Sequence, residues 1–328
     1  MISKNKLFIG ILLSLFLSIF LFSKTDVYAI LNTLRTVNFS LLFVAVVFYV
    51  ATLMARTFRF RVLLNKRVSL FDLGLIVSTY NLLSNILPFK VGELSYIFLT
   101  KQYLHIKTGI RIISWFLSRI LDVAALCLLY IVSILLLPTM TDIPSYGLLI
   151  VVVLFLCIFF SIIVASLCRS WAHNFLNNFH RRFISIRIIS YFTHKILDSI
   201  DSFPGREKSS LIAKAFLISI ILWIVSTLST FFIFSSLGLT LGFSDTLFIV
   251  VSLAIVSLIP VQGVGNIGVY EGGVSVALIA LGISTSQAIV YAFSLHVIQL
   301  LFTLVTGVVS GTFLLLKHHA AIKSFEST

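Results

Sequence analysis

The chain has 328 residues, of which 59% are hydrophobic and 11% charged, and its formal net charge is +13. This composition excludes an ordinary soluble domain, in which about 45–50% of residues are apolar and about 25% are charged. The basic residues gather between apolar runs without any nucleic-acid recognition motif, so they predict membrane topology and contact with anionic lipid headgroups, and no nucleic-acid partner. The class that remains is a polytopic membrane protein.

Six apolar runs are each near or above the roughly 20 residues that a helix needs to cross a bilayer. They cover residues 7–23, 39–55, 112–137, 146–168, 211–238 and 287–316. Two further apolar stretches, at about 70–100 and 244–283, are interrupted by Pro, Gly, Asn and acidic residues, as re-entrant hairpins or broken helices are. The predicted fold is an all-α polytopic membrane protein with six full spans and two broken-helix pairs, in a single transmembrane domain over residues 1–328.

The first apolar run follows Lys4 and Lys6, as in both signal peptides and uncleaved signal anchors. We expect an uncleaved anchor; cleavage near Ala29 is the alternative, and it leaves the remaining topology unchanged. If both broken stretches enter and leave on the same side, 20 of the 24 Lys and Arg residues lie on one side of the membrane. The positive-inside rule then predicts that both termini lie in the cytoplasm. The expected location is the bacterial inner (plasma) membrane.

The segment 169–205 is polar enough to lie outside the bilayer. Its aromatic and branched residues recur at three- and four-residue steps, and its basic residues occupy other faces. This pattern predicts an amphipathic helix on the cytoplasmic surface of the membrane. A solvated helix packed against other loops is the alternative.

A similar polar pattern occurs once in each half of the chain. A glutamate follows a break that contains proline and glycine, a basic residue follows 25 or 26 positions later, and a polar residue comes three positions after that: Glu93, Arg119 and Asp122, then Glu271, His296 and Gln299. Since the broken stretches would enter from opposite sides, the units 39–137 and 211–316 predict an inverted-topology repeat. A chance coincidence of two short patterns is the alternative.

Charged side chains within predicted membrane segments cost about 2.5–3.5 kcal/mol each near the bilayer centre, so they mark a candidate site. The candidate residues are Lys90, Glu93, Arg119, Asp122, Glu271 and His296. The helix breaks beside them depend on Pro88, Gly92, Pro260, Gly263, Gly265 and Gly268. Two interpretations stay open: a cavity that binds a substrate, or an ion-pair network that only holds the halves together. His296 is equally a candidate for a neutral, hydrogen-bonded core histidine.

Other motifs predict no chemistry. The segment 263–268 has the letters of a dinucleotide fingerprint, but its flanks are membrane sequence and position 288 is Ala, so its glycines favour a broken helix whose free N–H groups face an anion. The three cysteines lack ligand spacing, and the histidines of the tail and of the basic segment have no carboxylate or thiol at such spacing. We expect no metal, no cofactor and no catalytic residue, and therefore no enzyme.

Three motifs together resemble one known family. They are Pro88-Phe-Lys90-Val-Gly92-Glu93, Ser118-Arg119-Ile-Leu-Asp122 and Pro260-x-x-Gly263-x-Gly265-x-x-Gly268-x-x-Glu271. The chain is similar, over roughly residues 40–316, to the lysylphosphatidylglycerol synthase transmembrane-region family, also described as flippase-like integral membrane proteins. It departs from the family pattern at Lys90, Tyr96 and His296, where many relatives carry Arg, and this leaves the lipid headgroup open.

The resemblance implies a flippase-like transporter that moves an anionic or aminoacylated phospholipid, or a polyprenyl-linked sugar, between leaflets. Lys90 and Arg119 would receive phosphate, His296 would tune the second half, and the carboxylates Glu93, Asp122 and Glu271 would balance charge or take a cationic headgroup.

Expected partners are membrane lipids, with a lipid-modifying enzyme or glycosyltransferase as a candidate protein partner. Two alternatives remain: a membrane-embedded enzyme acting on a lipid-linked donor, and a non-transporting accessory protein.

Since the chain ends at Thr328, we expect a stand-alone member of the family without an aminoacyl-transfer domain.

Overall fold

The computed structural model describes residues 27–64, 68–136, 207–257 and 263–326, and these ranges contain helices and no strand. In chain order the elements are α2 (Val27–Arg35), α3 (Phe39–Leu64), α4 (Leu70–Ile86), η1 (Pro88–Leu94), α5 (Ser95–Leu104), α6 (Thr108–Leu136), α10 (Glu207–Ser236), α11 (Phe243–Val256), η2 (Val264–Asn266), α12 (Val269–Ala280) and α13 (Thr285–Glu326). The expected spans 7–23 and 146–168, the segment 169–205 and Pro260 lie outside the described residues.

Four described helices, α3, α6, α10 and α13, are long and apolar enough to cross a membrane. They make the chain a multi-pass helical membrane protein, and they correspond to the runs predicted at 39–55, 112–137, 211–238 and 287–316. The prediction ended the run 39–55 too early, because α3 continues to Leu64. Arg56 and Arg59 were counted as loop charges, but Arg59 is 1% exposed and Arg56 lines an internal cavity, so both belong to the membrane helix.

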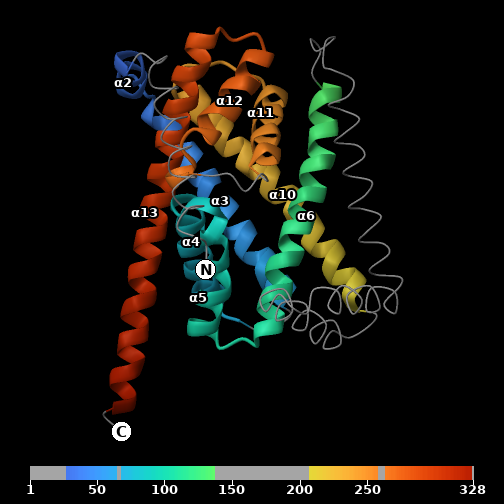
Figure 1. Cartoon of the computed structure of the whole chain (residues 1–328), viewed down its shortest axis with the longest axis vertical. Coiled ribbons are helices and arrows are strands. Elements are labelled where there is room, and N and C mark those ends of the chain that lie inside the picture. The colour runs from blue at the N-terminus through green and yellow to red at the C-terminus, as the bar shows by residue number, and fades with distance from the viewer. Residues whose placement is uncertain (1–26, 65–67, 137–206, 258–262, 327–328) are drawn as a thin grey trace, which may run out of the picture.

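Each of the two interrupted stretches folds as a pair of short helices on either side of a 3-10 segment. α4 and α5 flank η1, α11 and α12 flank η2, and the two helices of each pair pack against one another. The pair α4–α5 lies toward the end of the molecule where the C-terminus lies, and α11–α12 lies at the opposite end (Figure 1). Their breaks meet, since η1 contacts η2 and the side chains of Asn266 and Asn85 approach to 3.4 Å.

The sequence at the first break explains its shape. Pro88 has no N–H and restricts the preceding residue, so Leu87 is extended (φ −76°, ψ 132°) and α4 ends. Lys90 then adopts a left-handed φ of 54°. The returning chain passes so close to α4 that a Cβ on Gly92 would lie 2.0 Å from the Leu83 carbonyl oxygen. Only glycine fits this position.

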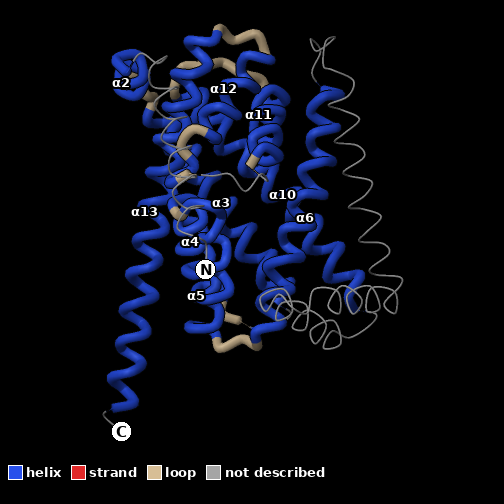
Figure 2. The backbone as a smooth tube through the Cα atoms, in the orientation of Figure 1, coloured by secondary structure: helices blue, strands red, loops and turns tan. Residues whose placement is uncertain are grey.

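The second break uses glycine for its conformation. After Gly263, which precedes η2, the left-handed residues are Gly265, Asn266 and Gly268, with φ of 66°, 57° and 91°. The Glu271 carboxylate then accepts a hydrogen bond from the Gly268 N–H at 2.6 Å and caps the first turn of α12. The glycine pattern therefore shapes a helix break, as the sequence predicted. Figure 2 shows loops at both ends of the bundle and also in its middle, where the breaks lie.

The two halves interlock. α3 and α10 pack side by side, α4 packs on α13, and α11 packs on α6, so each hairpin contacts the last helix of the other half. An aromatic cluster joins α3 to the first hairpin: Phe60 stacks on Tyr96 with ring centroids 4.1 Å apart, and Tyr80 meets both rings edge-on. The opposite side of α3 exposes large apolar residues at three- and four-residue steps, which is a lipid-facing stripe: Phe39, Phe43, Val47, Val50, Met54 and Phe58.

Close packing between α13 and α4 gives a matched pair of test positions. A Cβ on Gly307 would lie 2.3 Å from the Leu82 Cβ, whereas a Cβ on Gly311 would lie 3.7 Å from Thr79. We predict that Gly307→Ala lowers the free energy of unfolding by about 1–3 kcal/mol through overpacking, and that Gly311→Ala has little effect. Thermal unfolding of the two purified variants in detergent measures the difference. Equal midpoints would contradict the close approach of these helices.

Candidate functional site

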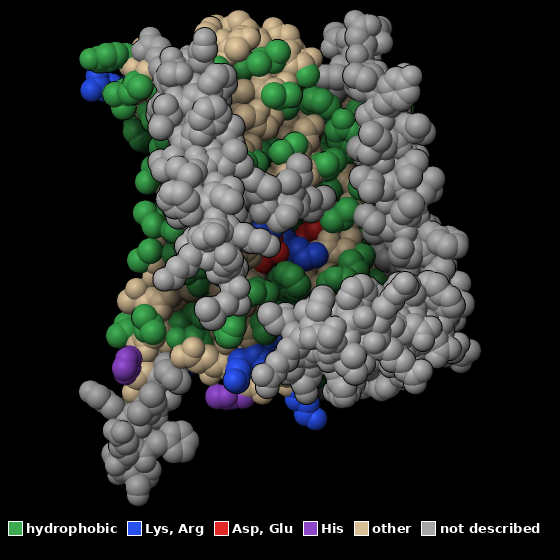
Figure 3. All heavy atoms as spheres, viewed as in Figure 1, with side chains coloured by type: hydrophobic (Ala, Val, Ile, Leu, Met, Phe, Trp, Pro, Cys, Tyr) green, Lys and Arg blue, Asp and Glu red, His purple; other side chains and the backbone are tan. Residues whose placement is uncertain are grey.

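Two adjoining polar cavities lie where the hairpins meet the long helices. The first has a volume of about 250 Å³ and the second about 210 Å³, and we call them the first and second chambers. Both are lined by residues from the two halves of the chain, and residues at their junction include Arg56, Asn81, Trp223, Tyr270 and Gln299. Figure 3 shows acidic and basic side chains together near the middle of one face, apart from the basic and histidine side chains at its lower edge.

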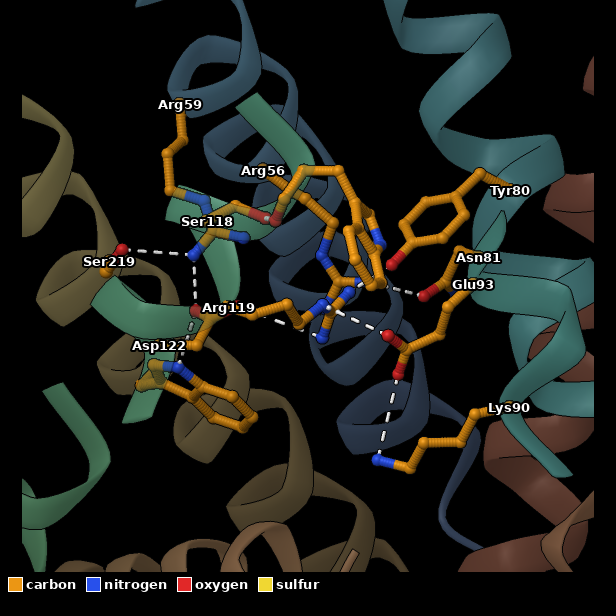
Figure 4. A network of polar contacts seen from close by, with 12 residues as sticks. Arg56, Arg59, Tyr80, Asn81, Lys90, Glu93, Ser118, Arg119, Asp122 and Ser219 are labelled. Atoms are coloured by element: carbon orange, nitrogen blue, oxygen red, sulfur yellow. Dashed lines mark hydrogen bonds and ion pairs between the residues drawn. The ribbon is translucent and has the colours of Figure 1, made fainter. Parts of the chain in front are cut away.

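The first chamber contains more cations than carboxylates. Its charged lining residues are Arg56, Lys90, Arg119, Glu93 and Asp122. The Glu93 carboxylate lies between two cations, with one oxygen 3.7 Å from the Lys90 Nζ and the other 3.4 Å from the Arg119 Nε (Figure 4). Arg119 also donates a hydrogen bond to the Tyr80 hydroxyl, and its Nη1 lies 4.0 Å from an Asp122 oxygen. The excess of positive charge suits an anion.

Asp122 is the centre of a buried ion pair beside this chamber. Its Oδ1 accepts hydrogen bonds from the Arg59 guanidinium and from the Trp223 Nε1, the latter at 3.1 Å. The same Arg59 nitrogen donates to the Ser219 hydroxyl at 3.0 Å. Only 1% of the Arg59 side chain and 9% of the Asp122 side chain are exposed. This part of the network joins α3, α6 and α10.

Arg56 stands apart from the other cations of the first chamber. Its Nη1 donates to the Asn81 Oδ1 at 2.5 Å, and no carboxylate of the described residues lies within 4.0 Å of it. It lines both chambers. Sequence reasoning missed Arg56 and Arg59 as site residues, although two arginines three positions apart within an aromatic, apolar run are a signal of a continuing membrane helix with a polar face.

In the second half of the chain, the glutamate and its basic partner are more deeply buried than Glu93 and Arg119 are in the first half. Glu271 and His296 are 2% and 4% exposed, and the Glu271 Oε1 lies 2.7 Å from the His296 Nδ1. The other Glu271 oxygen accepts the Gly268 N–H, so both oxygens are occupied by protein. The Tyr270 ring stacks on the imidazole with centroids 4.1 Å apart. His296 lines the second chamber, whereas Glu271 lines neither chamber and ties α12 to α13.

The matched polar sets of the sequence are brought into contact within each half. The glutamate of each set pairs with the basic residue 25 or 26 positions later: Glu93 with Arg119, and Glu271 with His296. The third members, Asp122 and Gln299, both hydrogen-bond to side chains of α10. The sets differ in chemistry, because the first presents carboxylates and an arginine to a chamber, whereas the second presents an imidazole and an amide.

The chambers are suited to holding an anion. In the described part of the chain, no group of three or more His, Cys, Asp or Glu side chains forms a candidate metal centre. The carboxylates Glu93 and Asp122 are each ion-paired with two cations instead, and among the described residues the Arg56 guanidinium on the cavity wall has no carboxylate within 4.0 Å. Guanidinium groups bind phosphate and carboxylate through two parallel hydrogen bonds.

The fold and the site define a class of protein: a multi-pass helical membrane domain whose two interlocked hairpins enclose a polar, cation-rich interior. Residues 7–307 match the model of one family, described as the lysylphosphatidylglycerol synthase TM region. The chain belongs to this family, which relates it to membrane lipid chemistry, and the resemblance seen in the motifs is confirmed. No curated protein matches the chain.

The buried and exposed ion pairs allow a direct comparison. We predict that Asp122→Asn lowers the free energy of unfolding by about 3–5 kcal/mol, because it leaves the buried Arg59 without its carboxylate. Asp72→Asn removes a pair with Lys317, whose side chain is 62% exposed, and should cost less than about 1 kcal/mol. Chemical or thermal unfolding of both variants in detergent tests this. A stable Asp122→Asn variant would show that the network does not hold the helices together.

Proposed function

We propose that the chain is a flippase-like transporter that moves a phosphate-bearing lipid between leaflets: an anionic or aminoacylated phospholipid, or a polyprenyl-linked sugar. The observation that carries the proposal is Arg56, a guanidinium inside a membrane protein with no carboxylate partner among the described residues. A charge in such a place is costly unless a counter-ion compensates it. Lys90 and Arg119 line the same chamber and would share the phosphate with Arg56.

The arrangement of the helices supports alternating access. We propose six spans in which the units 39–137 and 211–316 are inverted repeats. The packing of α4 on α13 corresponds to that of α11 on α6, and the two hairpins lie at opposite ends of the molecule. Transporters with inverted repeats bind substrate between broken helices and move one unit against the other. The chambers between the hairpins occupy the corresponding place.

The proposed setting is the bacterial plasma membrane, with both termini in the cytoplasm. Removing Arg56 and Arg59 from the count of loop charges leaves the positive excess on the same side. The partners we propose are the transported lipid and, at the basic cytoplasmic surface, a lipid-modifying enzyme or a glycosyltransferase.

The two alternatives explain less of the site. An enzyme acting on a lipid-linked donor needs a general base that can reach its substrate, but the Glu93 carboxylate is engaged by Lys90 and Arg119, and both Glu271 oxygens contact other protein groups. An accessory protein has no need for polar chambers with a cation that lacks a carboxylate within 4.0 Å among the described residues. We therefore propose that the chain is not an enzyme.

Arg56 provides the test of the proposed function. We expect Arg56→Gln to remain folded and to slow lipid translocation about 10- to 100-fold, since a hydrogen bond to a charged group contributes about 1.5–3 kcal/mol. Arg61→Gln is the matched control, because Arg61 is on the same helix but lines neither chamber. The assay follows fluorescent phosphatidylglycerol, or a fluorescent polyprenyl phosphosugar, in reconstituted vesicles. Wild-type protein that moves neither lipid faster than empty vesicles would overturn the proposal.

Arg119→Lys separates phosphate binding from structural pairing. The lysine keeps the charge near Glu93 but loses the planar fork that contacts Tyr80 and two carboxylates together. We predict near-normal insertion into the membrane and loss of most translocation in the same vesicles. Normal translocation by Arg119→Lys would leave Arg119 as a structural ion-pair residue only.

A further inference from the structure

We infer that the second chamber selects an uncharged, hydroxyl-bearing headgroup and rejects headgroups that carry an ammonium group. The inference rests on the proposed transport of a phosphate lipid and narrows its substrate to a phosphodiester with a glycerol or sugar headgroup. An aminoacylated phospholipid is then not the preferred cargo.

Neutral hydrogen-bonding groups make up one wall of the second chamber. The Arg56 guanidinium donates to the Asn81 Oδ1, and the Asn81 Nδ2 donates to the Tyr49 hydroxyl at 3.1 Å. The Tyr49 and Thr303 hydroxyls share a hydrogen bond of 3.1 Å. This chain crosses α3, α4 and α13, and it holds amide and hydroxyl groups in fixed positions beside the cavity. Such groups both donate and accept hydrogen bonds, as the hydroxyls of a sugar or glycerol do.

A second neutral chain lies at the junction of the chambers. The Tyr270 hydroxyl donates to the Gln299 Oε1 at 2.7 Å, and the Gln299 Nε2 donates to the Thr230 hydroxyl at 3.2 Å. The Tyr270 ring is held by its stacking on His296. Tyr270 and Trp223 are the aromatic side chains at this junction. Aromatic rings and a few fixed polar groups are the usual composition of a small-molecule site.

Carboxylates that could hold an ammonium group are absent from the described lining of the second chamber. Glu271 is buried behind it, with both oxygens engaged by His296 and Gly268. Glu93 and Asp122 line only the first chamber, and each is paired with arginine or lysine. An ammonium group in the second chamber would therefore be dehydrated without a counter-ion, and it would share the chamber with the cation Arg56.

The position of Arg56 and the size of the second chamber fit a phosphate at the junction and a headgroup in the second chamber. A phosphate held by Arg56 would lie at the junction, with its headgroup able to extend into the second chamber. The volume of about 210 Å³ is below the about 300–1,000 Å³ of typical small-molecule sites, which suits one small headgroup.

Competition between lipids tests the inference. The full-length protein is placed in nanodiscs that contain equal amounts of phosphatidylglycerol, phosphatidylethanolamine and lysylphosphatidylglycerol, and bound lipid is identified by native mass spectrometry. A parallel sample replaces phosphatidylglycerol with a polyprenyl phosphohexose. Phosphatidylethanolamine is the control for size, because its headgroup is small but carries an ammonium group. We expect phosphatidylglycerol or the phosphohexose to be retained at least about tenfold over both ammonium lipids, and the two samples distinguish the glycerol source from the sugar source.

A single substitution should change this selectivity. Gln299→Glu keeps an acceptor for the Tyr270 hydroxyl and places a carboxylate at the junction of the chambers. We expect it to raise the retention of lysylphosphatidylglycerol relative to phosphatidylglycerol at least about tenfold over wild type. Equal or preferred retention of either ammonium lipid by the wild-type protein would overturn the inference and leave the proposed transport intact. Retention of no phosphate lipid would overturn the proposed function as well.

Discussion

The pairing of Asp122 with Arg59 is the interaction on which the interior depends. Within a membrane protein an unpaired charge is expensive, so the carboxylate on α6 and the guanidinium on α3 must stay together. Trp223 and Ser219 attach the pair to α10. Three long helices are thereby fixed beside the first chamber, and the remaining cations are free to face its interior. Lipid tails are as apolar as the side chains of these helices, so hydrophobic packing alone supplies little driving force for one fixed register.

The two glutamates that look equivalent in the sequence have different surroundings. Glu93 is on a 3-10 segment next to a chamber, and its two cationic neighbours are themselves on the chamber wall. Glu271 is at the start of a helix, where the backbone N–H of Gly268 and the imidazole of His296 use both its oxygens. A similar spacing has thus kept a similar contact between the break and the last helix of each half, but only Glu93 of the two glutamates lines a chamber.

Much of this organisation could be predicted from the sequence because lipid imposes strict conditions on it. Long apolar runs, glycine and proline at the breaks, and matched glutamate–base spacings all have direct physical causes, and the described helices follow them. Arg56 and Arg59 could not be assigned in the same way. Composition cannot distinguish arginines in a loop from arginines on the inner face of a continuing helix, since that depends on which carboxylate or cavity the helix meets. The neutral walls of the second chamber likewise come from Tyr49, Asn81 and Gln299, which are far apart in the chain and carry no motif.

The pair between Lys317 and Asp72 also defines a depth in the membrane. Both charges are at the same end of the molecule, with Asp72 in the first turn of α4, so this end of the hairpin belongs at the headgroup level. The 17 residues of α4 extend about 26 Å from there, and the 14 residues of α11 extend about 21 Å from the opposite side. A bilayer with its headgroups is about 40–45 Å thick. Two upright helices of these lengths just reach one another across it, so the lengths of α4 and α11 are enough to place both breaks within the bilayer interior.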